Sequence, residues 1–243
     1  MRLRGNNSGQ ECDISFANLV ALRNTRLFQT YTMADQRVRP LLFAVKRWSK
    51  MRAISNASQD GGTLNSYTHV LMMLAYLQRQ RVIPPLQRIC CGKHPQETLR
   101  ASSAVADYTQ VSPSPNTMST GQLLVGFFRY YAFEFNYAEE CVSVRLGGTL
   151  SRSAKSWPDQ PGSSMRCADG QPAALCVEDP FVLERNCAVS AIRRSVAGIR
   201  WEYERALRAL LSNRGLEGAC LPWQEWPNKY YADLGVYDGS IEI

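Results

Sequence analysis

Apolar residues recur along most of the chain at spacings of three and four, which predicts a largely helical protein. The stretch RPLLFAVKRWSK, residues 39–50, shows this pattern clearly. Its apolar positions share one helical face: Leu41, Val45 and Trp48. We expect this helix to run from about Gln36 to Met51, with Asp35 as its N-cap.

Three more helices follow from the same reasoning. Residues 66–80, SYTHVLMMLAYLQRQ, are mostly apolar, which predicts a buried helix that begins at Asn65 or Ser66. Residues 119–135, STGQLLVGFFRYYAFEF, predict a capped helix rich in aromatic residues, and we interpret its run FFRYY as packing. The longest helix has apolar residues three or four positions apart: Ile192, Val196, Ile199, Tyr203, Leu207 and Leu210.

Signals for strands are few. CDISFANLV (12–20) has the composition of a strand, and we expect an Asn/Arg-rich turn at Leu22–Thr25 to follow it. CVSVRL (141–146) alternates apolar and polar residues, which predicts a second strand. The polar stretches 92–118 and 147–174 are expected to be irregular surface loops. The predicted fold class is therefore mainly α with a small β component (α+β).

No apolar run approaches the roughly 18 residues that a membrane-spanning helix needs, so no membrane partner is expected. The first ten residues, MRLRGNNSGQ, hold two arginines without an apolar stretch behind them. They predict neither a signal peptide nor a transit peptide. An intracellular protein is expected, with cytoplasm and mitochondrion both open.

The charge of the chain favours a polyanionic partner, since the formal net charge is +7 and the pI is near 9.1. Only five of the 28 basic residues are lysines, and two of these, Lys46 and Lys50, lie one turn apart on the first predicted helix. Like charges at this spacing repel each other, and a bound phosphate would neutralise that repulsion. A solvated helix face is the alternative explanation.

Eight cysteines are present, and without a secretory signal they are expected to be reduced thiols. CCGKH, with Cys90, Cys91 and His94, is the one stretch that resembles a set of metal ligands. A second paired cluster is missing, so a zinc site there is not favoured. His69 and His94 are the only histidines, so histidine-centred catalysis is poorly supplied.

The stretch GGTLNSY (61–67) leads into the predicted buried helix. The start of a helix after a glycine-containing loop offers free backbone N–H groups and the positive end of the helix dipole to an anion. If the two helices pack side by side, Lys46, Lys50 and this helix start converge on one pocket. Such a pocket suits a triphosphate, while a simple N-cap is the other reading of Ser66.

Five stretches follow one another along the chain: CDISFANLVALRNT, RPLLFAVKRWSK, GGTLNSYTHVLMML, GQLLVGFFRYYAFEF and LCVEDPFVLERNCA. Together, from about Cys12 to Ala188, they resemble the terminal RNA uridylyltransferases and non-canonical poly(A) polymerases, especially the trypanosomatid uridylyltransferases. These enzymes belong to the DNA-polymerase-β-like nucleotidyltransferase superfamily. The resemblance implies a palm-like domain with three acids around two Mg²⁺ (or Mn²⁺) ions, and a mostly helical domain that closes over the nucleotide.

The resemblance also implies roles for single residues. Asp13 matches the third metal acid, which helps to activate the 3′-hydroxyl of the RNA. Asn24 matches the residue that binds the ribose. Lys46 and Lys50 match the lysines on the triphosphate, and Ser66 matches the helix-start donor to phosphate.

For the base, Tyr67 matches the aromatic residue that stacks on it. Asp179, in EDPF, matches the first of two acids that hold a water at the uracil edge in the uridylyltransferases. The second acid usually follows EDPF directly, where this chain has Val182, with Glu184 two positions later. The resemblance therefore favours UTP as the substrate and leaves ATP as an alternative.

The metal acids depart from the family pattern. The first two acids of the family form Asp-x-Asp on a strand after a Gly-Ser turn, but neither motif occurs in the twelve residues before Asp13, and no Asp-x-Asp occurs elsewhere. Because one carboxylate cannot hold two Mg²⁺ ions, we expect this chain alone to be unable to transfer nucleotides. It is then a fragment, the product of a misannotated start, one part of a split enzyme, or an inactive relative that binds nucleotide or RNA.

The expected organisation has three parts. Residues 1–22 are the remnant of the palm-like domain, and 23–214 form the helical domain, with a PAP-associated region at about 119–188. Residues 215–243 form a C-terminal tail, whose aromatic residues predict that it is packed. The expected partners are an RNA 3′ end and UTP, with an RNA-processing protein complex as an open alternative.

Overall fold

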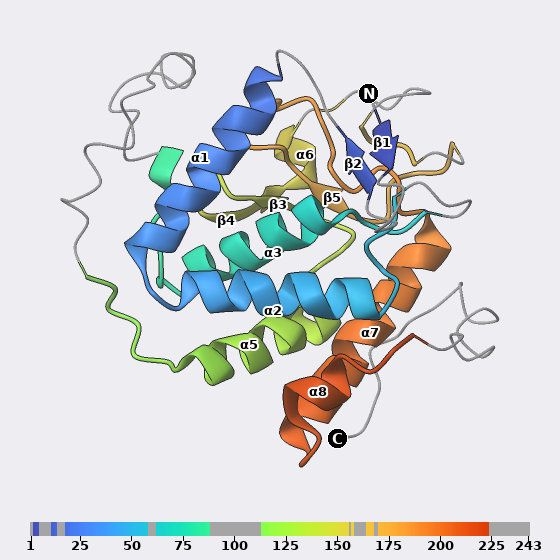
Figure 1. Ribbon diagram of the computed structural model, residues 1–243. Helices are drawn as coiled ribbons and strands as arrows, with labels where there is room; N and C mark the ends of the chain where they lie inside the picture. The colour runs from blue at the N-terminus through green and yellow to red at the C-terminus, as the bar shows by residue number, and fades with distance from the viewer. Residues whose placement is uncertain are drawn as a thin grey trace.

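The computed structural model describes residues 2–4, 11–13, 18–57, 62–87, 113–155, 157, 164–167 and 170–223, the first two segments by their backbone alone. Helices dominate, and a small three-stranded sheet packs on α3 (Figure 1). This confirms the predicted α+β class. In chain order the elements are β1 (Arg2–Arg4), β2 (Glu11–Asp13), α1 (Leu19–Ala34), α2 (Val38–Met51), α3 (Ser66–Arg79), α5 (Thr120–Arg129), the π-helical turn η2 (Tyr130–Glu134), β3 (Glu140–Ser143), β4 (Gly148–Ser151), α6 (Arg152–Lys155), β5 (Cys176–Val177), α7 (Arg193–Leu211) and α8 (Gly215–Ala219).

Helix α3 lies at the centre of the molecule. Every residue from Thr68 to Gln78 is buried, as the nearly continuous apolar sequence predicts. Helices α2 and α5 pack on α3, and the sheet of β3, β4 and β5 also contacts it (Figure 1). The side chain of Asn65 accepts a hydrogen bond of 2.8 Å from the Thr68 amide, so Asn65 is the N-cap and Ser66 is the first helical residue.

An aromatic cluster joins the helices around α3. The ring of Trp48, on α2, stacks on Tyr203 of α7 with centroids 5.2 Å apart, and meets Phe128 of α5 edge-on at 4.8 Å. Phe127 and Tyr131 complete the cluster, and all five side chains are fully buried. The packing role predicted for the aromatic run is therefore confirmed. Such ring pairs stabilise the core beyond the apolar area that they bury.

The sheet has the strand order β4-β3-β5. Strand β3 pairs antiparallel with β4 and parallel with β5, so that Cys141 lies opposite both Leu150 and Cys176. Gly147, in the turn between β3 and β4, has φ +94°, and a Cβ there would come within 3.2 Å of Pro85. Both the conformation and the space thus require glycine at this position.

The strand and turn predicted near the N-terminus need correction. Strand β2 covers only Glu11–Asp13, and Leu22–Thr25, which was expected to be a turn, lies within helix α1. Asn18 caps α1 by accepting the Ala21 amide at 3.0 Å, and residues with good helix propensity follow it. Asn24 is therefore on a helix. The domain boundary expected here falls inside α1, and the division into domains stays a prediction.

Three other boundaries differ from the prediction. The strand predicted at 141–146 is β3, which ends at Ser143. The stretch 147–174 is not irregular throughout, since it contains β4 and α6. These four-residue elements are too short to give a periodic signal, and β4 forms because it pairs with β3. Helix α2 begins at Val38 rather than Gln36, and its N-cap residue is Arg37 rather than the predicted Asp35, whose carboxylate accepts the Arg37 amide at 2.8 Å.

A buried ion cluster ties the chain after α2 to α7. Arg52 donates to both carboxylate oxygens of Glu202 at 2.9 Å, and Arg205 donates to one of them at 2.8 Å. The guanidinium of Arg52 also donates to the carbonyls of Leu221 and Pro222 at 2.6 Å. These contacts hold the start of the tail. Of the aromatic residues expected to pack there, Trp223 is 41% exposed, and Trp226, Tyr230 and Tyr231 lie outside the described residues. Within the described ranges, no helix has both the length and the apolar character to cross a bilayer.

Candidate functional site

Three residues that the family resemblance assigns to nucleotide binding lie together in the structure. The hydroxyl of Tyr67 donates a hydrogen bond of 2.8 Å to the side-chain oxygen of Asn24, and lies 3.4 Å from Oδ2 of Asp179. Asn24 is on α1, Tyr67 is in the first turn of α3, and Asp179 follows β5. Elements far apart in the sequence therefore supply one site, while the binding role of each residue stays a prediction.

Asp179 is fully buried, and neutral donors surround its carboxylate. Oδ1 accepts the amides of Phe181 and Val182 at 2.9 and 3.0 Å, and the Cys187 thiol lies 3.7 Å from Oδ2. Among the described residues, no lysine or arginine forms an ion pair with Asp179. The hydrogen bonds of this carboxylate within the described part of the chain therefore come from neutral groups.

The hydroxyl of Tyr67 is fixed as a donor. Burial raises the pKa of Tyr67, and the negative charge of Asp179 raises it further. The phenol therefore stays protonated. Because its proton goes to the oxygen of Asn24, the amide NH₂ of Asn24 remains available to a ligand.

Two site residues were not predicted from the sequence. The ring of Phe28 lies beside that of Tyr67, with centroids 5.6 Å apart, and the thiol of Cys187 contacts Asp179. Phe28 stands one helical turn after Asn24, so recognition of α1 as a helix would have placed it on the same side. No sequence signal marks Cys187, because its position depends on how the segment after β5 folds back.

Lys46 and Lys50 are both exposed on α2, and neither forms an ion pair within the described part of the chain. Helix α2 packs on the first half of α3, where the rings of Trp48 and His69 have centroids 5.8 Å apart. The two lysines thus stand on the helix that neighbours the start of α3. Their contact with phosphate stays a prediction.

Ser66 is half-buried at the start of α3. Since Asn65 accepts the Thr68 amide, the amides of Ser66 and Tyr67 remain without an acceptor among the residues that the structure describes. These are the free N–H groups that an anion binds at a helix start. The geometry therefore permits the predicted phosphate contact at Ser66.

For the metal, the structure describes the backbone of Asp13 as the last residue of β2, opposite Arg2 of β1. In the described ranges, no group of three or more His, Cys, Asp or Glu side chains could hold a metal ion. The CCGKH stretch lies outside these ranges, and the cysteines whose side chains are described are buried free thiols, as predicted: Cys141, Cys167, Cys176, Cys187 and Cys220.

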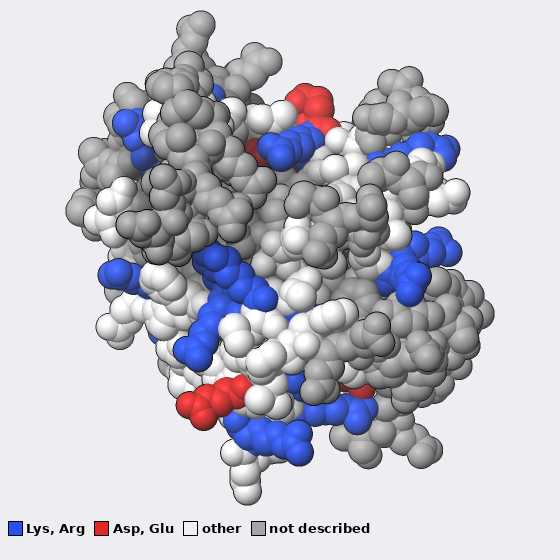
Figure 2. All heavy atoms as spheres, turned by 45° about the vertical axis from the view of Figure 1, so that its right-hand side comes forward, with Lys and Arg blue, Asp and Glu red and all other residues white. Residues whose placement is uncertain are grey.

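The surface charge agrees with the basic composition. On the face that Figure 2 shows, the described charged side chains are mostly lysine and arginine, in several separate groups. Exposed basic residues of α2 and α7 include Lys46, Arg47, Lys50, Arg193 and Arg194. A surface of this kind attracts polyanions.

The comparison with known families matches the segment that carries Asp179, whereas Asn24 and Tyr67 lie before that segment. A family model, described as Cid1 family poly A polymerase, matches residues 119–185. The match runs from the N-cap of α5 to the turn after Asp179. Poly(A) RNA polymerase cid11 of Schizosaccharomyces pombe is 34% identical over 217 residues, which are 88% of this chain and 42% of that protein. The chain thus spans less than half the length of this relative.

This chain covers a larger share of the solved structures that it matches than of cid11. The structure of a cytoplasmic RNA terminal U-transferase has a TM-score of 0.75 and 30% identity, and the match covers 92% of this chain and 69% of that chain. A structure of Cid1 in complex with the UTP analogue UMPNPP has a TM-score of 0.72 and 30% identity, with 87% and 67% covered.

Proposed function

Because the chain belongs to the Cid1 family of poly(A) polymerases and terminal uridylyltransferases, we propose that it is the nucleotide-binding part of an RNA 3′-terminal nucleotidyltransferase, with UTP as the preferred nucleotide. The observation that supports this most is the convergence of Asn24, Tyr67 and Asp179. The UTP analogue in the matching Cid1 structure agrees with it.

Each part of the nucleotide has its own residues in this proposal. The ring of Tyr67 stacks on the base, and the free amide NH₂ of Asn24 donates to the ribose. Lys46, Lys50 and the amide of Ser66 bind the triphosphate, whose charge offsets the repulsion between the two lysines. In this proposal, separate residues thus bind the base, the ribose and the triphosphate.

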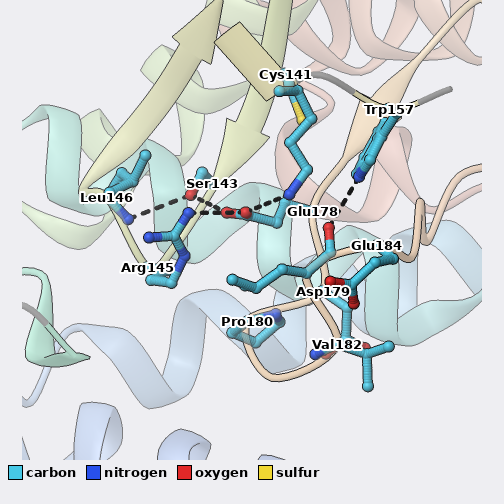
Figure 3. Close-up of polar contacts among 12 residues, drawn as sticks. Cys141, Ser143, Arg145, Leu146, Trp157, Glu178, Asp179, Pro180, Val182 and Glu184 are labelled. Atoms are coloured by element: carbon cyan, nitrogen blue, oxygen red, sulfur yellow. Dashed lines mark hydrogen bonds and ion pairs between the residues drawn. The ribbon is translucent and has the colours of Figure 1, made fainter. Parts of the chain in front are cut away.

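The base preference rests on Asp179 in this proposal. Val182, at the expected position of the second acid, has an apolar side chain, and its backbone amide already donates to Asp179 at 3.0 Å. Glu184 is exposed in the following turn (Figure 3). One carboxylate discriminates less than two, so ATP is the second candidate nucleotide.

We further propose that the chain does not transfer nucleotides by itself. In this family's reaction, divalent metal ions stabilise charge in line with an attacking hydroxyl. The resemblance assigns one metal acid, Asp13, and the sequence contains no Asp-x-Asp. Mg²⁺ or Mn²⁺ would be bound when Asp13 is combined with such a pair, and an RNA 3′ end would then be the acceptor.

Calorimetric titration of the chain with UTP tests the binding function. We expect UTP to bind without a metal requirement, and a chain that does not bind UTP would contradict the proposal. For transfer, the chain is joined to an upstream segment with Gly-Ser and Asp-x-Asp and is assayed on an RNA oligonucleotide with UTP and Mg²⁺. Asp13→Ala is expected to abolish extension of the RNA, and full activity of that variant would refute the role of Asp13.

A further inference from the structure

Two contacts hold the turn that carries Asp179, one at each end. Before the turn, Nζ of Lys155 donates to Oε1 of Glu178 at 2.6 Å. After it, the indole N–H of Trp157 donates to the carbonyl of Leu183 at 2.9 Å (Figure 3). Nζ of Lys155 also lies 4.7 Å from the centre of the Trp157 ring. Lys155 and Trp157 therefore form one unit that fixes where the turn begins and ends.

Glu178 is a rigid anchor for the start of the turn. Its side chain is buried, and its carboxylate also accepts from Arg145 at 2.9 Å and from the hydroxyl of Ser143 (Figure 3). Burial tends to raise the pKa of Glu178, but its three donors outweigh that effect and lower the pKa, so the carboxylate is charged. A buried charge with several charge-assisted hydrogen bonds has little freedom to move.

Between these two anchors, the backbone orients the carboxylate of Asp179. Its Oδ1 accepts the amides of Phe181 and Val182 within the turn. Its Oδ2 is thereby directed to Tyr67, 3.4 Å away. A backbone shift at either end of the turn would move this oxygen relative to the tyrosine ring.

We propose that Lys155 and Trp157 are positioning residues that hold the Asp179 turn against Tyr67, and so set how tightly the base of the nucleotide is bound. This inference rests on the proposed function, because it concerns the base side of the same site. The phosphate side is built on α2 and the start of α3 instead. Loss of either residue is therefore expected to weaken base binding and to spare phosphate binding.

The test compares two probes, UTP and inorganic tripolyphosphate, by calorimetric titration of the chain. Trp157→Phe removes the indole N–H and keeps an aromatic ring beside Lys155. We expect UTP to bind about fivefold to tenfold more weakly, as for the loss of one hydrogen bond. Tripolyphosphate affinity is expected to stay within about twofold. Trp201→Phe, on α7, is the matched control and is expected to bind both probes as the wild type does.

A second pair of variants tests Lys155. Lys155→Met removes the charge that faces Glu178 and is expected to weaken UTP binding at least as much as Trp157→Phe does. Lys155→Arg keeps the charge and is expected to restore most of the affinity. Thermal unfolding of each variant identifies any general loss of the fold, and Trp157→Phe keeps the test valid if Lys155→Met does not fold.

The outcomes separate this inference from the proposed function. The inference is overturned if Trp157→Phe binds UTP like the wild type, or loses affinity for both probes equally, while Tyr67→Ala still weakens UTP binding. If the wild type does not bind UTP, or if Tyr67→Ala has no effect, then the proposed function itself fails. A selective loss of UTP affinity in Trp157→Phe supports both.

Discussion

The hydroxyl of Tyr67 donates a 2.8 Å hydrogen bond to the side-chain oxygen of Asn24, 43 positions earlier in the chain. This bond joins α1 to the start of α3 and directs the NH₂ group of Asn24 away from the tyrosine. Oδ2 of Asp179 lies 3.4 Å from the same hydroxyl. One phenol thus links the groups proposed to bind the ribose and the base.

Two substitutions of Tyr67 separate the contribution of its hydroxyl to UTP affinity from that of its ring. Tyr67→Phe keeps the ring and frees Asn24 to rotate, so we expect UTP affinity to fall about threefold to tenfold. Tyr67→Ala also removes the stacking surface and is expected to cost at least about tenfold. Calorimetric titration measures both. Tyr130→Phe is the control, because the buried Tyr130 hydroxyl has no hydrogen-bond partner among the described residues. Equal affinity of Tyr67→Phe and wild type would show that the hydroxyl does not organise the site.

The two lysines of α2 are predicted to act on the triphosphate alone. In the double variant Lys46→Ala, Lys50→Ala, we expect UTP affinity to fall about 100-fold, since each lost charged contact costs about tenfold. Affinity for uridine, which has no phosphate, is expected to stay unchanged. Arg39→Ala with Arg129→Ala removes the same charge from other exposed positions and serves as the control. A similar loss of UTP affinity in that control would show that the two lysines act only through the general positive charge of the protein.

Val182 is predicted to limit the preference for UTP. Val182→Glu restores an acid directly after EDPF, and we expect the ratio of UTP to ATP affinity to rise about tenfold, as for one hydrogen bond to a charged group. Competition titration with the two nucleotides measures the ratio. Glu184→Gln is the control and is expected to leave the ratio unchanged, because Glu184 is exposed. A fall of the ratio in Glu184→Gln would show that Glu184 replaces the second acid.

The helices that the sequence predicts well are those with a clear apolar period. Helices α2, α3, α5 and α7 each bury one face or all faces, and their periodicity is visible without any tertiary information. Family resemblance then named Asn24, Tyr67 and Asp179, which the structure brings together.

What could not be predicted depends on contacts between distant segments. Helix α1 has polar residues on most sides, so it shows no clear apolar period, and its N-cap residue Asn18 is the feature that indicates a helix. Residue propensities alone do not distinguish this segment from a strand followed by a turn. Strand β4 forms only because β3 is beside it. The anchoring of Glu178 requires Arg145 and Lys155 from separate elements, and no local pattern shows that they meet.

The buried pair of Arg52 and Glu202 is predicted to be essential for stability. Their side chains are 5% and 0% exposed. Glu202→Gln leaves the buried guanidinium of Arg52 without its anion, and we expect the free energy of unfolding to fall by about 3–5 kcal/mol. Urea denaturation measures this change. In the double variant Arg52→Met, Glu202→Met, the loss of unfolding free energy is expected to be smaller than the sum of the losses in the two single variants, Arg52→Met and Glu202→Met. Additive losses would show that the pair is not coupled.

His69 is predicted to make the fold sensitive to acid. It is fully buried, and burial lowers its pKa from 6.5 to about 4. Its Nε2 lies 3.0 Å from the carbonyl of Ile54, so this nitrogen carries the proton, and Nδ1 lies 3.4 Å from the hydroxyl of Tyr203. The imidazole is therefore neutral in the folded protein at neutral pH.

The consequence for stability follows from the direction of this shift. Between pH 6.5 and about pH 4, the unfolded chain binds a proton at His69 that the folded chain does not. The free energy of unfolding therefore decreases as the pH is lowered through this range. The contribution of His69 amounts to about 2 kcal/mol between pH 7.5 and pH 5. His69→Gln keeps an N–H donor for Ile54 and cannot titrate. Urea denaturation of both proteins at the two pH values isolates His69, because every other titrating group is shared. The variant is expected to lose about 2 kcal/mol less than the wild type, and parallel losses would mean that His69 is protonated in the folded state.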